Sequence, residues 1–206
     1  ARNGWERPVW FAGSAQEATL QEKLTLRRPA FTAAIANECR GASEGVALAE
    51  LAGFTRFEVS GPDAAAALDA AIAGALPRVG RTTLAYILTH RGGVASEFTI
   101  TRLAENRFWL LSAAGAEWYD RDLLARLLRG NLTVDEQPAG LTTLIVAGPR
   151  SRELLAGLTD ADLTDAAFPW LAARTIRVAD VPVTAIRVSY VGELGWEIYI
   201  PADFAL

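Results

Sequence analysis

Residues 187–201 read RVSYVGELGWEIYIP, and this stretch decides the fold. Apolar and polar residues alternate on both sides of two glycines, which is the pattern of two half-buried strands. Gly192 and Gly195 free the backbone to bend, so the stretch predicts a hairpin closed by a tight turn. The same pattern runs back to Val183, where the first strand begins.

The alternation assigns a face of the hairpin to each side chain. The apolar face carries Ile186, Val188, Tyr190, Trp196, Ile198 and Ile200. Glu197 and Tyr199 therefore point away from that face. A carboxylate beside aromatic rings can recognise a flat polar ring, because the ring stacks on an aromatic side chain and its adjacent N–H groups need a two-oxygen acceptor.

Other segments follow the periods of strands or helices. Strands are predicted at 46–48, 54–59, 81–89, 94–101, 108–112, 132–134, 143–147 and 175–178. Helices are predicted over 30–40, roughly 62–74, 117–129 and from 148 through 158. The first helix would bury Phe31, Ile35 and Cys39 and stop at Gly41. The third would bury Leu123, Leu124, Leu127 and Leu128.

A repeat organises these elements. The sequence VSGP at 59–62 recurs as VAGP at 146–149, each time between a strand and a helix. We expect two α+β units of the ferredoxin-like type, about 46–130 and 132–206, each an antiparallel sheet with helices on one face. Two similar lobes packed together leave a cleft, which is a natural ligand site.

Composition excludes several classes of function. The chain of 206 residues has 51% hydrophobic and 21% charged residues and a net charge of -4, which is ordinary for a soluble globular protein. There is no basic footprint for nucleic acid and no run of roughly 20 apolar residues that could cross a membrane. The N-terminus lacks the apolar core of a signal peptide. A single cysteine, Cys39, fits a buried position in a cytoplasmic protein without disulfides.

The motif in the hairpin, S-Y-x-G-E-x-G-W-E, resembles the signature of the glycine-cleavage T-protein (aminomethyltransferase) family. It is similar above all to the folate domain fused to dimethylglycine and sarcosine dehydrogenases and oxidases. The resemblance implies an N-terminal arm over residues 1–30, in which 4–11 resemble the linker from a flavin domain, and a folate-binding domain over residues 31–206. The resemblance implies that residues 1–206 do not include the family's C-terminal domain. Since the chain lacks methionine altogether, even at its start, we expect a fragment of a longer protein.

A second segment, at 86–103, resembles the family's strand, Gly-Gly turn and strand. An acidic residue four positions after the second glycine is credited there with catalysis, because it lies beside the amine nitrogens of tetrahydrofolate and can take a proton. The matching residue is Glu97, where the family usually has aspartate, and Thr89 stands where it usually has asparagine. The longer side chain leaves two alternatives open: a pocket that compensates, or a domain that binds folate and transfers carbon poorly.

The resemblance implies roles for three further residues. Tyr190 would line the folate pocket, and Glu197 would accept hydrogen bonds from the N–H edge of the pterin ring. Thr101, on the strand face of Glu97, would line the same cavity. Arg187 and Trp196 would support the strand instead of touching ligand.

Other chemistry finds no support in the sequence. His90, the only histidine, lies beside a Gly-Gly turn and is expected to be an exposed turn residue. With one histidine and one cysteine far apart, no metal site has suitable spacing. No glycine-rich phosphate loop is present, so FAD would sit only on a separate domain or subunit.

The resemblance implies tetrahydrofolate-dependent one-carbon transfer within a sarcosine or dimethylglycine dehydrogenase or oxidase. Its partners would be folate, a small N-methylated amine or its iminium, and a flavoprotein domain or subunit. One alternative is a free-standing aminomethyltransferase or folate-dependent demethylase. Another is a catalytically degraded module for folate binding or assembly.

Overall fold

The computed structural model describes residues 10–20, 25–51, 53–136, 140–190 and 192–204. Its helices are α1 (Thr32–Glu44), α2 (Ala64–Ala71), α3 (Glu117–Leu127) and α4 (Ser151–Ala156), with short 3-10 turns at Glu17–Thr19, Ala114–Ala116 and Ala202–Phe204. Its strands are β1 (Ala47–Glu50), β2 (Phe54–Ser60), β3 (Arg81–Leu88), β4 (Val94–Ala104), β5 (Arg107–Ala113), β6 (Thr133–Glu136), β7 (Leu141–Ala147), β8 (Ala173–Val178), β9 (Val181–Ile186) and β10 (Gly195–Pro201).

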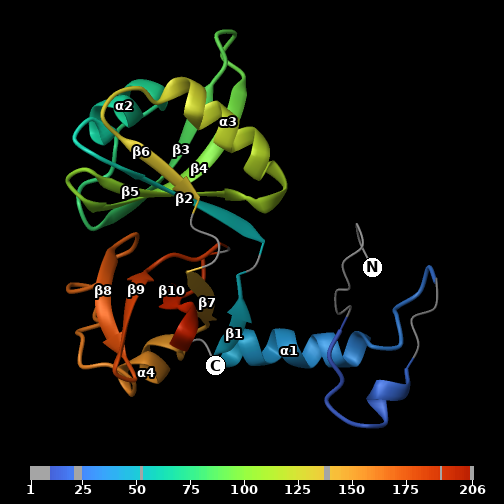
Figure 1. The fold of residues 1–206 in the computed structure, drawn as a ribbon. Coiled ribbons are helices and arrows are strands. Elements are labelled where there is room, and N and C mark those ends of the chain that lie inside the picture. The colour runs from blue at the N-terminus through green and yellow to red at the C-terminus, as the bar shows by residue number, and fades with distance from the viewer. Residues whose placement is uncertain (1–9, 21–24, 52, 137–139, 191, 205–206) are drawn as a thin grey trace.

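In the described part of the chain these strands form two five-stranded sheets, ordered β3-β4-β5-β2-β6 and β1-β7-β10-β9-β8. Every strand pair is antiparallel. The predicted α+β class, with two sheet-and-helix units, is confirmed. In Figure 1 the two sheets are stacked, with α2 and α3 outside the first and α4 outside the second.

Each sheet has a core on its helix side. The first core holds Phe57, Val59, Phe98, Ile100, Phe108 and Leu110, packed with Leu68 of α2 and Leu124 of α3. The second holds Trp196, Ile198, Val146, Val183 and Ala185 with Leu155 of α4. A third cluster, Trp109, Leu111, Ala173, Ile186 and Tyr199, lies between the sheets. Both faces of both sheets are thus partly buried, and the face between them holds the site described below.

The two sheets exchange short strands at their edges. β1 lies at the start of the first predicted unit but pairs with β7 of the second sheet. β6 begins the second half of the chain but pairs with β2 of the first sheet. The predicted division at residues 46–130 and 132–206 therefore does not coincide with the sheets, because the chain runs through the second sheet, then the first, and then the second again.

The two Gly-Pro turns of the repeat adopt the same backbone conformation. Gly61 has φ +129° and Gly148 has φ +122°, a region that side chains with a Cβ rarely adopt. A Cβ on Gly148 would lie 2.5 Å from the carbonyl oxygen of Gly45 and 2.8 Å from that of Ala42, at the end of α1. The missing side chain lets the end of α1 pack directly on the turn before α4.

We expect Gly148→Ala to lower the free energy of unfolding by about 2–4 kcal/mol, because it combines backbone strain with a steric clash. Urea unfolding followed by circular dichroism measures this loss. Gly115→Ala is the matched control, since a Cβ there would have no heavy atom within 4 Å and the backbone φ is not positive. Equal stability of the two variants would contradict the proposed packing.

Several local predictions were wrong. α1 continues through Gly41 to Glu44, since a single glycine costs a helix only about 1 kcal/mol. Cys39 is exposed, and Ile35 is 38% exposed, because α1 extends away from the sheets (Figure 1). Leu127, on α3, is 42% exposed. The tight hairpin turn is instead a longer connection over 187–194, because β9 ends at Ile186.

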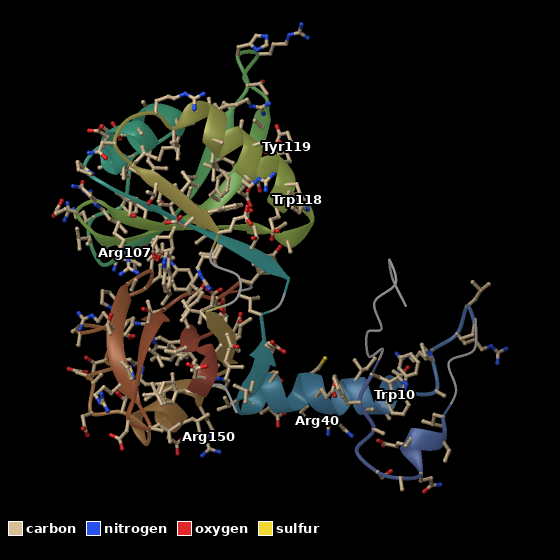
Figure 2. The ribbon with its side chains drawn as sticks, viewed as in Figure 1. Trp10, Arg40, Arg107, Trp118, Tyr119 and Arg150 are labelled. Carbon is tan, nitrogen blue, oxygen red and sulfur yellow. The ribbon has the colours of Figure 1, made fainter. Side chains whose placement is uncertain are left out.

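Only part of the N-terminal arm lies within the described residues. Trp10 stacks on Phe31 with ring centroids 5.6 Å apart, at the start of α1 (Figure 2). The rest of the predicted linker at 4–11, apart from Phe11, lies outside the described residues. No helix in the described ranges is long and apolar enough to span a membrane.

Candidate functional site

A cavity of about 410 Å³ opens between the two sheets. The first sheet contributes Thr82, Thr83, Leu84, Glu97, Thr99 and Leu111 to its wall. The opposite wall consists of Trp170, Leu171, Val188, Ser189, Tyr190 and Glu197, and Leu51 and Phe54 close one side. Three of the four predicted site residues, Glu97, Tyr190 and Glu197, thus meet at one cavity, although they lie up to a hundred positions apart in sequence.

Glu197 lies on β10, the central strand of the second sheet, where it faces the first sheet. The hydroxyl of Tyr199 donates a hydrogen bond of 2.6 Å to its Oε2. Burial raises the pKa of Glu197, and the hydrogen bond from Tyr199 offsets part of that effect. No hydrogen bond to Oε1 joins the described residues, so this oxygen remains available to a ligand in the cavity.

Tyr199 points away from Trp196 and Ile198, as the alternation predicts, but its side chain is only 1% exposed. Its ring lies 5.1 Å from that of Trp109 on β5, and the Arg56 guanidinium on β2 lies over both rings. The sequence did not predict the contacts of Arg56 and Trp109 with Tyr199, since alternation alone cannot show that a second sheet covers this face.

Glu97 lies on β4 opposite Tyr86 of β3, and its side chain is exposed at the cavity. The pKa of Tyr86 is raised by partial burial and by the charge of Glu97 and a hydrogen bond with it. Glu97 thus lies beside a phenol on the neighbouring strand and remains open to solvent and to a ligand, as an acid–base group requires.

Thr101 lies on the same face of β4 but is fully buried. Its hydroxyl forms a hydrogen bond of 2.9 Å with that of Thr82, and Thr82, not Thr101, lines the cavity. Thr101 therefore does not line the cavity, contrary to the prediction, but supports the lining residue Thr82.

Tyr190 is 93% exposed and lies in the 187–194 connection, not on a strand. Phe54, Leu84 and Trp170 are also about half exposed around the cavity. Together these four residues form an apolar rim with three aromatic rings, which the sequence did not predict beyond Tyr190, because they come from four separate segments.

The remaining motif residues have structural contacts. Trp196 is fully buried, and Arg187 donates to the carbonyl of Phe168 at 2.7 Å and pairs with Asp165. Thr89 closes the β3–β4 turn by accepting a hydrogen bond from the Gly93 amide at 3.1 Å. His90 is exposed in this turn, as expected.

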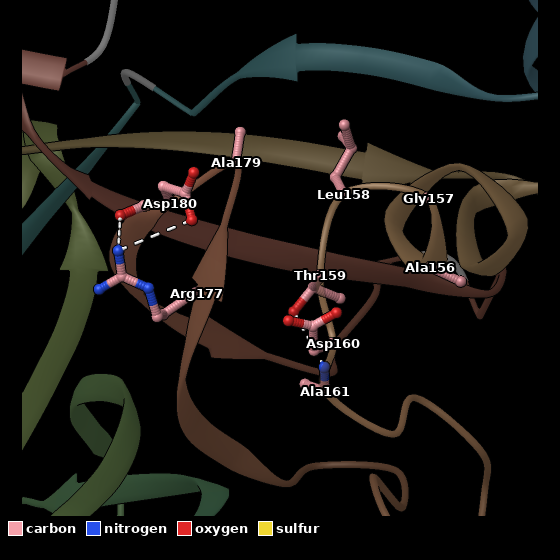
Figure 3. Close-up of a pocket in the computed structure, with 9 residues that line it drawn as sticks. All are labelled: Ala156, Gly157, Leu158, Thr159, Asp160, Ala161, Arg177, Ala179 and Asp180. Carbon is pink, nitrogen blue, oxygen red and sulfur yellow. Dashed lines mark hydrogen bonds and ion pairs between the residues drawn. The ribbon is translucent and has the colours of Figure 1, made fainter.

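A larger depression of about 600 Å³ lies beside α4 and the β8–β9 turn (Figure 3). Its charged residues, Asp160, Arg177 and Asp180, are all exposed, and Arg177 pairs with Asp180 across the turn. It offers no buried polar group, so the cavity between the sheets is the better candidate site. Within the described ranges, no cluster of three or more His, Cys, Asp or Glu side chains could hold a metal ion.

Comparison with known proteins identifies the family. The model described as "GCVT N-terminal domain" matches residues 1–206. The chain belongs to this family. Dimethylglycine dehydrogenase, mitochondrial, of Rattus norvegicus is 36% identical over 199 residues, covering 95% of this chain and 23% of that protein. The 4-methylaminobutanoate oxidase (formaldehyde-forming) of Paenarthrobacter nicotinovorans is 35% identical over 206 residues, covering 99% of this chain and 25% of the oxidase.

Among solved structures, glycine cleavage system aminomethyltransferase T from Bartonella henselae matches with a TM-score of 0.70 and 24% identity, covering 92% of this chain and 52% of the other. This likeness is one of fold. The chain spans about a quarter of the length of the curated relatives it matches. The chain is therefore a member of the GCVT N-terminal domain family that is related in sequence to dimethylglycine dehydrogenase, and the predicted resemblance is confirmed.

Proposed function

We propose that this chain is the tetrahydrofolate-dependent one-carbon transfer domain of a sarcosine or dimethylglycine dehydrogenase or oxidase. The observation that carries the proposal is the meeting of Glu197 and Glu97 at one cavity, from opposite sheets. The first provides a partly desolvated acceptor, and the second an accessible base. The relatives named above act on N-methylated compounds by their printed names, which supports the same substrate class.

The donor set of the cavity fits a reduced pterin. A pterin presents adjacent N–H donors at one edge, which pair with a carboxylate in a two-point contact. Glu197 offers such a carboxylate at the cavity wall. Tyr190, Trp170 and Phe54 at the rim provide rings against which a flat ligand can stack.

The chemistry divides between ligand and protein. Bound tetrahydrofolate would supply the nucleophilic amine nitrogens that attack the iminium carbon, and the demethylated amine would take up a proton and leave as its bond to that carbon breaks. Glu97 would orient the reacting end and accept the proton that leaves as the carbon–nitrogen bond forms. The cavity would hold both reactants together and limit the access of water.

The proposed reaction also needs a source of the iminium, which would lie outside this chain. The iminium that the domain consumes would come from a flavoprotein domain or subunit, with FAD bound there and not here. A cytoplasmic location stays a prediction; the dimethylglycine dehydrogenases it resembles are named as mitochondrial.

One observation favours a second candidate function. Glu97 replaces the usual aspartate and is exposed, so its longer side chain can adopt several positions. A catalytic base works best when its carboxylate is held in one position. A domain that binds folate for assembly or sensing, with degraded catalysis, would tolerate this change.

Calorimetric titration of the full-length protein with tetrahydrofolate tests the proposal. We expect saturable binding at one site per chain. The control ligand is p-aminobenzoylglutamate, which lacks the pterin ring. It should bind far more weakly if the carboxylate of Glu197 accepts hydrogen bonds from that ring. Absence of binding by tetrahydrofolate would overturn the proposed function.

A further inference from the structure

The strongest feature that the proposed roles leave unexplained is the contact between Tyr199 and Glu197. Both side chains lie on one face of β10, two residues apart, so their contact follows from the strand period. The Tyr199 hydroxyl donates to Glu197 Oε2 at 2.6 Å, a short bond of the kind that O–H groups make to an ionised carboxylate. The tyrosine ring is almost fully buried, whereas Glu197 reaches the cavity.

The ring of Tyr199 is held from the opposite sheet. Trp109 packs against it, with its indole Nε1 donating to Glu58 at 2.9 Å, and Glu58 is in turn paired with Arg107 at 2.8 Å. Arg107 marks the edge of this interface in Figure 2. The hydroxyl therefore cannot leave Glu197 without disturbing the packing between the sheets.

We propose that Tyr199 is a positioning residue that keeps the Glu197 carboxylate ionised and turns its Oε1 into the cavity. The inference rests on the proposed function, in which Glu197 accepts hydrogen bonds from the ligand. Tyr199 itself touches no ligand.

The charges around the pair support this assignment. Burial and the charge of Glu197 raise the pKa of Tyr199 well above its usual value, so the hydroxyl stays a donor throughout the neutral range. Arg56 on β2 lies over the tyrosine ring, and Glu97 on β4 and Tyr190 line the same cavity. On the neighbouring strands β7 and β9, Glu197 pairs with Ile145 and Ile186, which do not titrate.

The sign of the expected effect follows from the hydrogen bond. The bond from Tyr199 stabilises the ionised form of Glu197 against the burial that disfavours it. Tyr199→Phe keeps the ring and removes the donor, so the carboxylate should ionise only at higher pH. Hydrogen bonds to charged groups have a strength that corresponds to a shift of about one pH unit or more.

The test is a pH titration of the Glu197 carboxyl by carbon-13 NMR of glutamate-labelled protein, with Glu197→Gln used to assign the signal. We expect Tyr199→Phe to raise the midpoint by about one unit and Tyr119→Phe, an exposed tyrosine on α3 (Figure 2), to leave it unchanged. Equal midpoints in wild type and Tyr199→Phe would overturn the proposal. This measurement needs no ligand, so it stands apart from the outcome of the folate titration.

A second readout links the pair to binding. If tetrahydrofolate binds, its affinity in Tyr199→Phe should fall by up to about tenfold at pH values below the wild-type midpoint, and the loss should shrink as the pH rises through the midpoint of the variant. A loss that is independent of pH would mean that the hydroxyl serves packing alone, and would also overturn the proposal.

Discussion

Glu197→Gln is expected to abolish measurable binding of tetrahydrofolate, with a loss of affinity of at least about 100-fold. The amide keeps one acceptor oxygen but replaces the other with an NH₂ group, which would face the N–H donors of the pterin. Two charge-assisted hydrogen bonds are lost, each about 1.5–3 kcal/mol, which together exceed the 2.7 kcal/mol that corresponds to about 100-fold. Calorimetric titration of the full-length protein measures the change.

The fold should survive this substitution. The amide is neutral, so the burial that raises the pKa of Glu197 no longer opposes it, and its oxygen can still accept the bond from Tyr199. Urea unfolding should therefore show unchanged or slightly higher stability. Glu105→Gln, at an exposed turn between β4 and β5, is the matched control and should bind as wild type does. Tight binding of tetrahydrofolate by Glu197→Gln would show that Glu197 does not contact the ligand.

The same carboxylate makes binding dependent on pH. The contact requires the ionised form, and burial raises the pKa of Glu197 above its usual value. The affinity for tetrahydrofolate should therefore be highest above that pKa and fall as the pH drops through it. This fall should occur at a higher pH than it would for a contact made by an exposed glutamate.

Much of the fold could be predicted because its signals are local. The Gly-Pro turns at 61–62 and 148–149 place a glycine where only a residue without Cβ fits, and the sequence shows both copies. In strands such as β2 and β10, the alternation of apolar and polar residues indicates which side chains face the helix-side core. The exchange of β1 and β6 between sheets could not be predicted, because a four-residue strand contains no information about its distant partner.

The site was predicted less completely, for a physical reason. Alternation marks one buried face of a strand, whereas β10 is buried on both. Tyr199, Trp109 and Arg56 are amphipathic, so in sequence they resemble residues of a solvated face. The rim residue Tyr190 was assigned to a strand because Val188 continues the alternation, but the chain leaves the sheet after Ile186.

The second large effect concerns catalysis. Glu97→Ala is expected to reduce one-carbon transfer to tetrahydrofolate by about 100-fold or more while leaving its affinity unchanged, because a positioned general base contributes about 10²–10⁴ in rate. The alanine removes the group that accepts the proton but alters no contact with the pterin edge, which faces Glu197 on the other sheet. Single-turnover transfer by the full-length protein separates this step from binding and product release.

Glu97→Asp distinguishes the two alternatives that the longer side chain leaves open. If the pocket is adapted to glutamate, the Glu97 carboxylate reaches the reacting end, and shortening the side chain by one methylene should reduce the rate by up to about 100-fold. If catalysis has degraded, aspartate should instead raise a low wild-type rate. Tyr86→Phe provides the control for the adapted pocket, because it removes the hydroxyl group opposite Glu97 without changing the length of the glutamate side chain. It should lower the rate in wild type but have little effect in the Glu97→Ala background. Transfer by Glu97→Ala at the wild-type rate would show that the proton leaves by another route.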